Sequence, residues 1–166
     1  TFTYGIKSAL DPKLITLKDE TVDDAVSALH LAQTIKEVDQ KKIFLIGHSL
    51  GAMAAPRIAK QTPFIAGIIY MAGNSRPFED VILDQMKYLL PLQAPKRQAD
   101  SILNDIIAHV AQIKTGNFTD TSRNMLFGIS GVYWKDIRDY DQVEVAKSLS
   151  VPMLFLQGEK GYQVNM

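Results

Sequence analysis

The stretch that decides the fold is IFLIGHSLGAMAA, residues 43–55. Its first four residues, 43–46, are apolar and rich in β-formers, which predicts a buried strand of a parallel sheet. Small residues and an amphipathic pattern over residues 51–60 predict a helix directly afterwards. The two elements meet at GHSLG, residues 47–51, whose G-x-S-x-G spacing marks a sharp strand-to-helix turn.

The spacing is that of a nucleophile elbow, in which a serine is mounted on a strained turn. A serine hydroxyl attacks poorly unless it is held away from competing hydrogen bonds and offered to a base, so Ser49 is the candidate nucleophile. We expect Gly47 and Gly51 to flank it because a Cβ at either position would meet neighbouring backbone. The Leu50 amide would lie at the helix N-terminus, where an unpaired N–H stabilises an oxyanion. The alternative is a Gly-Ser turn between a core strand and a helix, without chemistry.

Composition predicts an ordinary globular protein and removes several classes of function. A length of 166 residues is typical of a single domain, and 46% of the residues are hydrophobic and 22% charged. Equal numbers of basic and acidic residues, 18 each, give no electrostatic case for binding nucleic acid or an anionic membrane. The absence of cysteine excludes disulfides, thiolate metal sites and a cysteine nucleophile, but assigns no compartment. No run approaches the length of a membrane span, and no signal-peptide pattern opens the sequence, which is uninformative if the beginning is missing. There is no metal or nicotinamide motif, so no cofactor is expected.

Periodicity predicts the other elements. Residues 1–20 have no sustained period, whereas Thr21-Val22-Asp23-Asp24 looks like a capping box that opens a helix reaching about residue 38. Apolar residues at helical spacing from Phe78 to Leu89 predict a helix that Pro91 is expected to stop. A longer helix, with apolar residues from Ala99 to Ile113, is expected to end with Gly116 as its C′ residue. The remaining expected elements are buried strands at 65–72 and 151–158, helices within 77–140, and a short helix at 143–149.

Several side chains outside the turn have two interpretations. Tyr133 and Trp134 belong to the main aromatic cluster, which forms either a wall of a substrate pocket or, as is commoner, part of a core. His30 and His109 lie beside apolar helical stripes and are interpreted as surface or packed histidines. Arg57 is expected to be a solvated helix residue.

The order of these elements resembles the middle of an α/β-hydrolase, and in particular bacterial esterase-like members related to the serine aminopeptidase group. The resemblance implies hydrolysis of a small-molecule ester, or a related acyl compound, through an acyl-serine intermediate. It implies a partial α/β-hydrolase fold with about three mostly parallel strands, divided into a core (1–76), a helical cap (77–141) and a return to the core (142–166). The pieces that carry the resemblance, in order, are TVDDA (21–25), IGHSLG (46–51), APRIA (55–59), AGIIYMAG (66–73), YW (133–134), YD (140–141) and LQGE (156–159).

The catalytic acid departs from the pattern of these hydrolases. They usually place it a few residues after the last strand, in a pattern like G-x-x-D, and here Gly161 stands at that position. Glu159 is the nearest carboxylate, and is either a substitute acid or an exposed loop residue. Asp136, Asp139 and Asp141 lie in the helical insertion, without support from element order.

The catalytic histidine is the second departure. The family order of serine, acid, histidine places the base after the last strand. His30 and His109 lie elsewhere, and His48 sits inside the elbow, where its ring cannot easily serve the adjacent serine. We therefore expect an internal piece of a protein about twice as long, with an exposed edge on the elbow strand and no activity as this chain alone.

Three functions remain open at this stage. The first is a carboxylesterase-type serine hydrolase. The second is a non-catalytic, hydrolase-like binding protein that has lost the acid at Gly161. The third is an acyltransferase, because G-H-S-L-G also resembles acyltransferase elbows.

Overall fold

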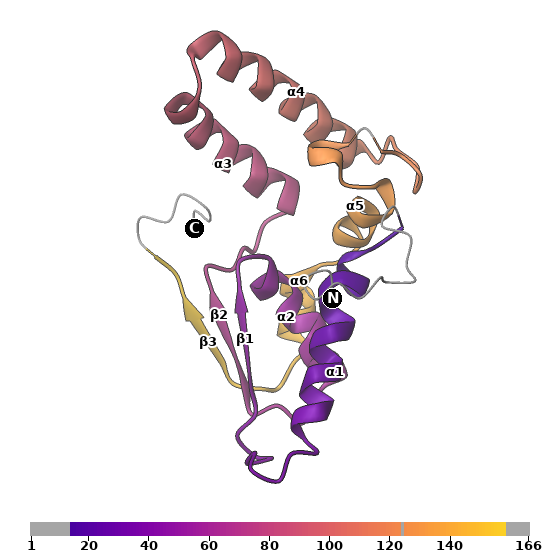
Figure 1. The fold of residues 1–166 in the computed structure, drawn as a ribbon, viewed down its shortest axis with the longest axis vertical. Coiled ribbons are helices and arrows are strands. Elements are labelled where there is room, and N and C mark those ends of the chain that lie inside the picture. Colours follow the sequence, from indigo (N-terminus) through magenta and orange to yellow (C-terminus); the bar gives the residue numbers. More distant parts are fainter. Residues whose placement is uncertain (1–13, 124, 159–166) are drawn as a thin grey trace.

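The computed structural model describes residues 14–123 and 125–158, and contains a three-stranded parallel sheet in the order β1-β2-β3 (Figure 1). The strands are β1 (Phe44–His48), β2 (Gly67–Met71) and β3 (Met153–Leu156). His48, Met71 and Leu156 lie in register, so all three strands end at the same edge. The mixed fold with parallel strands at these positions confirms the prediction from periodicity.

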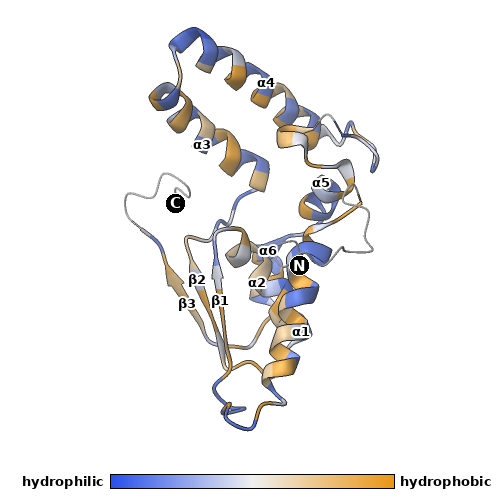
Figure 2. Cartoon of the chain, viewed as in Figure 1, coloured by the Kyte–Doolittle hydropathy of each residue, from blue (hydrophilic) through white to orange (hydrophobic). Residues whose placement is uncertain are grey.

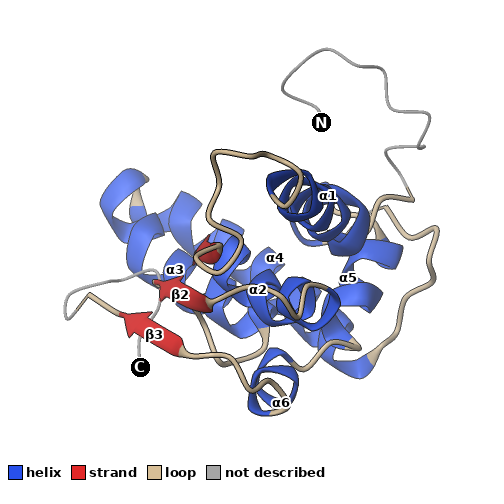
Figure 3. Cartoon of the chain, turned by 90° about the horizontal axis from the view of Figure 1, so that it is seen from below, coloured by secondary structure: helices blue, strands red, loops and turns tan. Residues whose placement is uncertain are grey.

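Helices α1 (Asp23–Ala32), α2 (Leu50–Gln61) and α6 (Gln142–Lys147) lie on one side of the sheet (Figure 3). The side chains of Ile68 and Tyr70 on β2 are buried under these helices, together with the alanines of α2. Alternate residues point to the opposite face, which the described part of the chain leaves uncovered. There Phe44 is 53% exposed and Ile46 is 60% exposed. β1 is an edge strand within the described residues, as the sequence predicts.

The helical segment, residues 78–138, forms a second apolar core. Helices α3 (Phe78–Gln93) and α4 (Lys96–Thr115) make an antiparallel hairpin, followed by a 3₁₀ turn, η3 (Leu126–Gly128), and α5 (Gly131–Arg138). Apolar surfaces of α3 and α4 face each other (Figure 2). Gly116 follows α4 with φ 69°, which confirms its predicted C′ role. Side chains central to this core are Ile82, Leu90, Ile106, Val110, Ile113 and Trp134.

The first helix begins earlier than the sequence analysis places it. A π-helical turn, η2 (Lys18–Val22), leads directly into α1, so Thr21 lies inside a continuous helical segment and does not cap it. The reciprocal capping pair is instead Thr16 and Asp19. The Asp19 N–H donates to the Thr16 hydroxyl at 3.2 Å, and the Thr16 N–H donates to the Asp19 carboxylate at 3.0 Å. The Thr16 hydroxyl also donates to that carboxylate, which lowers the pKa of Asp19 below its usual value.

Two predicted helix ends are also wrong. The first helix ends at Ala32 rather than near residue 38, and tighter turns follow, such as the Thr34 N–H donating to Leu31 O. Pro91 does not stop α3, which continues to Gln93. The helix ends at Ala94, whose φ of −139° is extended because Pro95 disfavours a helical conformation in the residue before it.

Thr16→Ala should lower the free energy of unfolding of the full-length protein by about 1 kcal/mol, because it removes one half of the capping pair. The difference should shrink as the pH falls through the lowered pKa of Asp19, since a protonated carboxyl no longer favours the native state. The measurement is urea unfolding at several pH values.

Thr21→Ala is the matched control and should change the free energy of unfolding by less than about 0.5 kcal/mol. A larger loss for Thr21→Ala than for Thr16→Ala would place the cap where the sequence pattern does.

Candidate functional site

The turn between β1 and α2 holds Ser49 in a strained backbone conformation. Its φ is 54° and ψ is −114°, in a region that residues with a side chain rarely adopt. The Ser49 N–H donates to Met71 O at 2.9 Å, which ties the turn to β2. The Ser49 carbonyl accepts from the Met53 N–H at 3.1 Å, which begins the hydrogen bonding of α2. The serine therefore stands at the carboxyl edge of the sheet, at the point where the helix starts.

The two glycines of the motif have different roles. A Cβ on Gly47 would lie 2.5 Å from Gly51 O and 2.7 Å from Ala52 Cα, so the strand passes against the first turn of α2 with no room for a side chain. A Cβ on Gly51 would meet nothing within 4 Å. The expectation that both glycines are required by close approach is confirmed for Gly47 and wrong for Gly51, because only Gly47 faces the helix backbone.

Two groups at the turn are available to an incoming molecule. The partly exposed Ser49 side chain makes no capping hydrogen bond to α2, so the helix does not occupy its hydroxyl. Leu50 is the first residue of α2, and the helix itself has no acceptor for its N–H. A hydroxyl and a backbone donor thus sit side by side at the positive end of a helix.

The histidines of the chain lie on three different elements. His48 is the exposed last residue of β1, inside the turn itself. His30 is exposed on α1, with its ring centroid 5.2 Å from that of Phe64. His109 lies on α4.

The three aspartates near the end of the helical insertion, Asp136, Asp139 and Asp141, have structural partners. Asp136 pairs with Arg57, Asp139 pairs with Lys135, and the Asp141 carboxylate caps α6 by accepting from two backbone N–H groups at 2.9 Å. Glu159 and Gly161 lie outside the described residues.

Tyr133 and Trp134, the predicted aromatic pair, have different surroundings: Trp134 lies in a core and Tyr133 makes a contact at the surface. Trp134 is fully buried in the core of the helical segment, with its ring 6.1 Å from that of Phe78. The Tyr133 hydroxyl donates to Glu20 at 2.6 Å, and burial together with this bond raises the pKa of Tyr133. The complete burial of Trp134 in this core favours the core interpretation for it.

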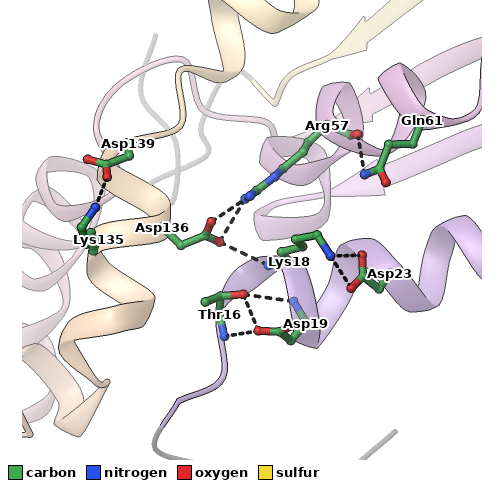
Figure 4. Close-up of polar contacts among 9 residues, drawn as sticks. All are labelled: Thr16, Lys18, Asp19, Asp23, Arg57, Gln61, Lys135, Asp136 and Asp139. Carbon is green, nitrogen blue, oxygen red and sulfur yellow. Dashed lines mark hydrogen bonds and ion pairs between the residues drawn. The ribbon is translucent and has the colours of Figure 1, made fainter. Parts of the chain in front are cut away.

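Arg57 is not the solvated helix residue that its position suggests. Its guanidinium donates to both carboxylate oxygens of Asp136, at 3.0 and 2.8 Å (Figure 4). These bonds raise the pKa of Arg57 above its usual value. Local sequence carries no signal for this pair, because its members are 79 residues apart.

Two cavities lined by described residues lie near the carboxyl edge of the sheet. The larger, about 520 Å³, lies between α2, α6 and the sheet, where its walls include Ala52, Tyr70 and Phe155. The smaller, about 200 Å³, lies where the helical segment joins the core and is lined by Met53, Phe78, Ile137 and Gln142 among others. Ser49 itself lines neither cavity, but Met53 stands about one turn after it on α2.

Comparison with known sequences decides the family. Residues 5–149 match the sequence profile described as the alpha/beta hydrolase family. The chain belongs to this family. A similar hydrolase is Esterase EstD of Thermotoga maritima, 32% identical over 157 residues that cover 93% of this chain. The chain spans 35% of the length of that relative.

No cluster of three or more His, Cys, Asp or Glu side chains in the described part of the chain is arranged to hold a metal ion. None of its described helices has the length and apolar character needed to cross a membrane.

Gly47→Ala should lower the free energy of unfolding of the full-length protein by about 3 kcal/mol or displace α2, because the new Cβ overlaps backbone that cannot move alone. Gly51→Ala should be neutral or stabilise by up to about 1 kcal/mol, because it replaces a helical glycine in open space. Urea unfolding of the two variants measures the contrast, and equal losses would contradict the assignment of the contact to Gly47.

Proposed function

We propose that the protein containing this chain is a serine hydrolase that cleaves carboxylic esters through an acyl-serine intermediate. The observation that carries the proposal is the backbone of Ser49, held at φ 54° between a parallel strand and a helix. That conformation keeps the hydroxyl off the helix and at the carboxyl edge of the sheet. The printed name of the Thermotoga maritima relative, an esterase, supports the choice of an ester as substrate.

In the proposed reaction the Ser49 hydroxyl oxygen attacks the carbonyl carbon of the ester while its proton passes to a general base. The negative charge that develops on the carbonyl oxygen is stabilised by the Leu50 N–H and the N-terminus of α2. The alcohol then leaves with the proton, and an acyl-serine remains. Water, activated by the same base, releases the carboxylic acid and restores Ser49.

The base and the acid are assigned by element order. β3 ends in register with β1, so the chain after Leu156 leaves the sheet at the same edge as Ser49. Glu159 is the third residue after Leu156 in the sequence and is the candidate acid in this chain. No histidine follows it here. We therefore assign the base, and the second oxyanion donor, to parts of the protein outside this sequence, and expect no turnover from these 166 residues alone.

The helical segment is proposed to act as a cap. The α3–α4 hairpin lies beyond the carboxyl ends of the strands (Figure 1), and Ser49 directly follows the end of β1. The segment has an apolar core of its own, separate from the core under the sheet. These features support a division into residues 1–76, 77–141 and 142–166, with the middle part covering the site.

Ser49→Ala in the full-length protein should lower kcat/KM for p-nitrophenyl esters by at least about 10⁴-fold, since a triad nucleophile has no substitute. A fluorophosphonate probe should label the wild-type protein at Ser49 and leave the variant unlabelled. Ser27→Ala, which removes an exposed hydroxyl on α1, should change neither result. Labelling of a different serine would contradict the proposed nucleophile.

The Gly161 position keeps a second function open, a binding protein that retains the hydrolase scaffold without catalysis. That function predicts no turnover by the unmodified full-length protein and a gain of activity in Gly161→Asp. If the unmodified protein is active, Glu159→Gln tests the acid: a large loss of kcat supports Glu159, whereas no loss leaves it as a loop residue. Product analysis with an added acyl acceptor separates hydrolysis from acyl transfer.

A further inference from the structure

Pro56 interrupts the hydrogen bonding of α2, the helix that begins directly after Ser49. Proline has no backbone N–H, so the helix supplies no donor for Ala52 O, four residues earlier. The proline ring also crowds that carbonyl, and helices bend and loosen at such a point. The loosened turn lies about two turns after Ser49, on the helix whose first N–H, that of Leu50, is the proposed oxyanion donor.

A side chain from outside the helix is bonded to this loosened turn. The Tyr140 hydroxyl donates to Met53 O at 2.9 Å, although the two residues are 87 positions apart. In a regular α-helix, Met53 O accepts from the N–H of Arg57, the residue directly after Pro56. Burial raises the pKa of Tyr140, and a hydrogen bond from the Arg57 backbone acts in the opposite direction. The hydroxyl therefore meets both backbone groups that close the turn containing Pro56.

The ring of Tyr140 is held by Arg57 and its carboxylate partner. The Arg57 guanidinium carbon lies over the Tyr140 ring, 5.4 Å from its centroid. The same guanidinium forms the bidentate pair with Asp136 of α5, with side chains 25% and 15% exposed (Figure 4). A bidentate pair has a fixed relative orientation, because two parallel hydrogen bonds must be satisfied together. Tyr140 is thus fixed at its ring as well as at its hydroxyl.

One residue connects Tyr140 to the turn at Ser49. The Met53 N–H donates to Ser49 O at 3.1 Å, and the Met53 carbonyl accepts from Tyr140. The Met53 side chain is 2% exposed and packs in an apolar cluster with Ile137, so the residue is held on all sides. A displacement of the Met53 carbonyl would therefore move the residue that closes the first turn of α2. The direction of the Leu50 N–H depends on that turn.

We propose that Tyr140 is a positioning residue whose hydroxyl stabilises α2 at Pro56 and thereby keeps Ser49 and the Leu50 N–H aligned with the developing oxyanion. The proposal rests on the proposed ester hydrolysis, because Ser49 and Leu50 have these roles only in that reaction. It goes beyond it by assigning a share of the oxyanion stabilisation to a residue that follows α5 and acts through Met53.

The test uses the full-length protein and removes single hydroxyl groups. Tyr140→Phe deletes the hydroxyl on Met53 O and keeps the ring under Arg57. The matched control is Tyr133→Phe, because the Tyr133 hydroxyl donates to Glu20 on η2 at 2.6 Å and makes no printed contact with α2 backbone. Titration with a fluorophosphonate first gives the fraction of active protein in each preparation. kcat and KM for p-nitrophenyl acetate are then measured per active site.

Tyr140→Phe should lower kcat by about tenfold and change KM by less than about twofold, because an oxyanion donor acts in the transition state. Formation and hydrolysis of the acyl-serine both pass through an oxyanion, so kcat should fall whichever step limits the rate. Tyr133→Phe should leave both constants within about twofold of wild type. A merely structural role would lower the titrated fraction and leave kcat per active site unchanged, and that result would overturn the proposal.

Pro56→Ala locates the effect. This substitution restores the missing N–H, so α2 can close its own hydrogen bonds without the Tyr140 hydroxyl. In a Pro56→Ala background, Tyr140→Phe should therefore lower kcat by less than about threefold, which a double-mutant cycle measures. An undiminished tenfold loss in that background would show that the hydroxyl does not act at the proline turn, against the proposal.

Amide hydrogen exchange of residues 50–61 supplies a readout that needs no enzymatic activity. Exchange in α2 should be faster in Tyr140→Phe than in Tyr133→Phe, and equal rates would contradict the stabilisation of α2 by Tyr140. If the wild-type protein neither labels nor hydrolyses any ester, the proposed function fails and the oxyanion assignment fails with it. The exchange experiment still decides in that case whether Tyr140 stabilises α2 at Pro56.

Discussion

The close approach of Gly47 to the first turn of α2 is the constraint on which the rest of the structure depends. Because the strand backbone touches the helix backbone at this point, the chain must reverse within the single residue Ser49. A non-glycine residue in such a conformation costs about 1–3 kcal/mol, so it persists only where surrounding contacts determine it. Here the hydrogen bond to Met71 and the packing of the α2 alanines on the sheet supply those contacts.

The same edge of the sheet contains a second strained residue. Ala72, directly after β2, has φ 48°, and its N–H donates to Leu156 O at 2.9 Å. The neighbouring strands β1 and β2 therefore both leave the sheet through a residue with positive φ.

The molecule has two separate apolar cores, one under the sheet and one inside the helical segment. A third cluster, which includes Leu17, Met53 and Ile137, connects them at α5. The helical segment thus meets the core at this third cluster and at polar pairs such as Arg57–Asp136. On the sheet, the face with Phe44 and Ile46 is uncovered by the described residues, and more of the esterase relative lies outside the matched region than within it.

Patterns among residues close in sequence determined the types and approximate places of many elements of this fold. The alternation and apolar runs of the three strands, the G-x-S-x-G turn and the glycine after α4 depend on contacts within a few residues, so their types and approximate places were predictable. Even local signals were ambiguous where two patterns competed. Thr16-x-x-Asp19 has the same spacing as Thr21-x-x-Asp24, which the sequence analysis took as the capping box, and the helical segment begins at the first.

Only the tertiary structure decided which glycine of the turn is required, where α3 ends, and what Arg57 does. Gly47 and Gly51 look equivalent in the motif, and only the position of α2 distinguishes them. Arg57 and Asp136 are 79 residues apart, and their meeting depends on how α5 packs on α2, which no local pattern encodes. The type and place of the turn could be predicted because its glycine and serine spacing is local, whereas the cavities are formed by side chains that only packing brings together.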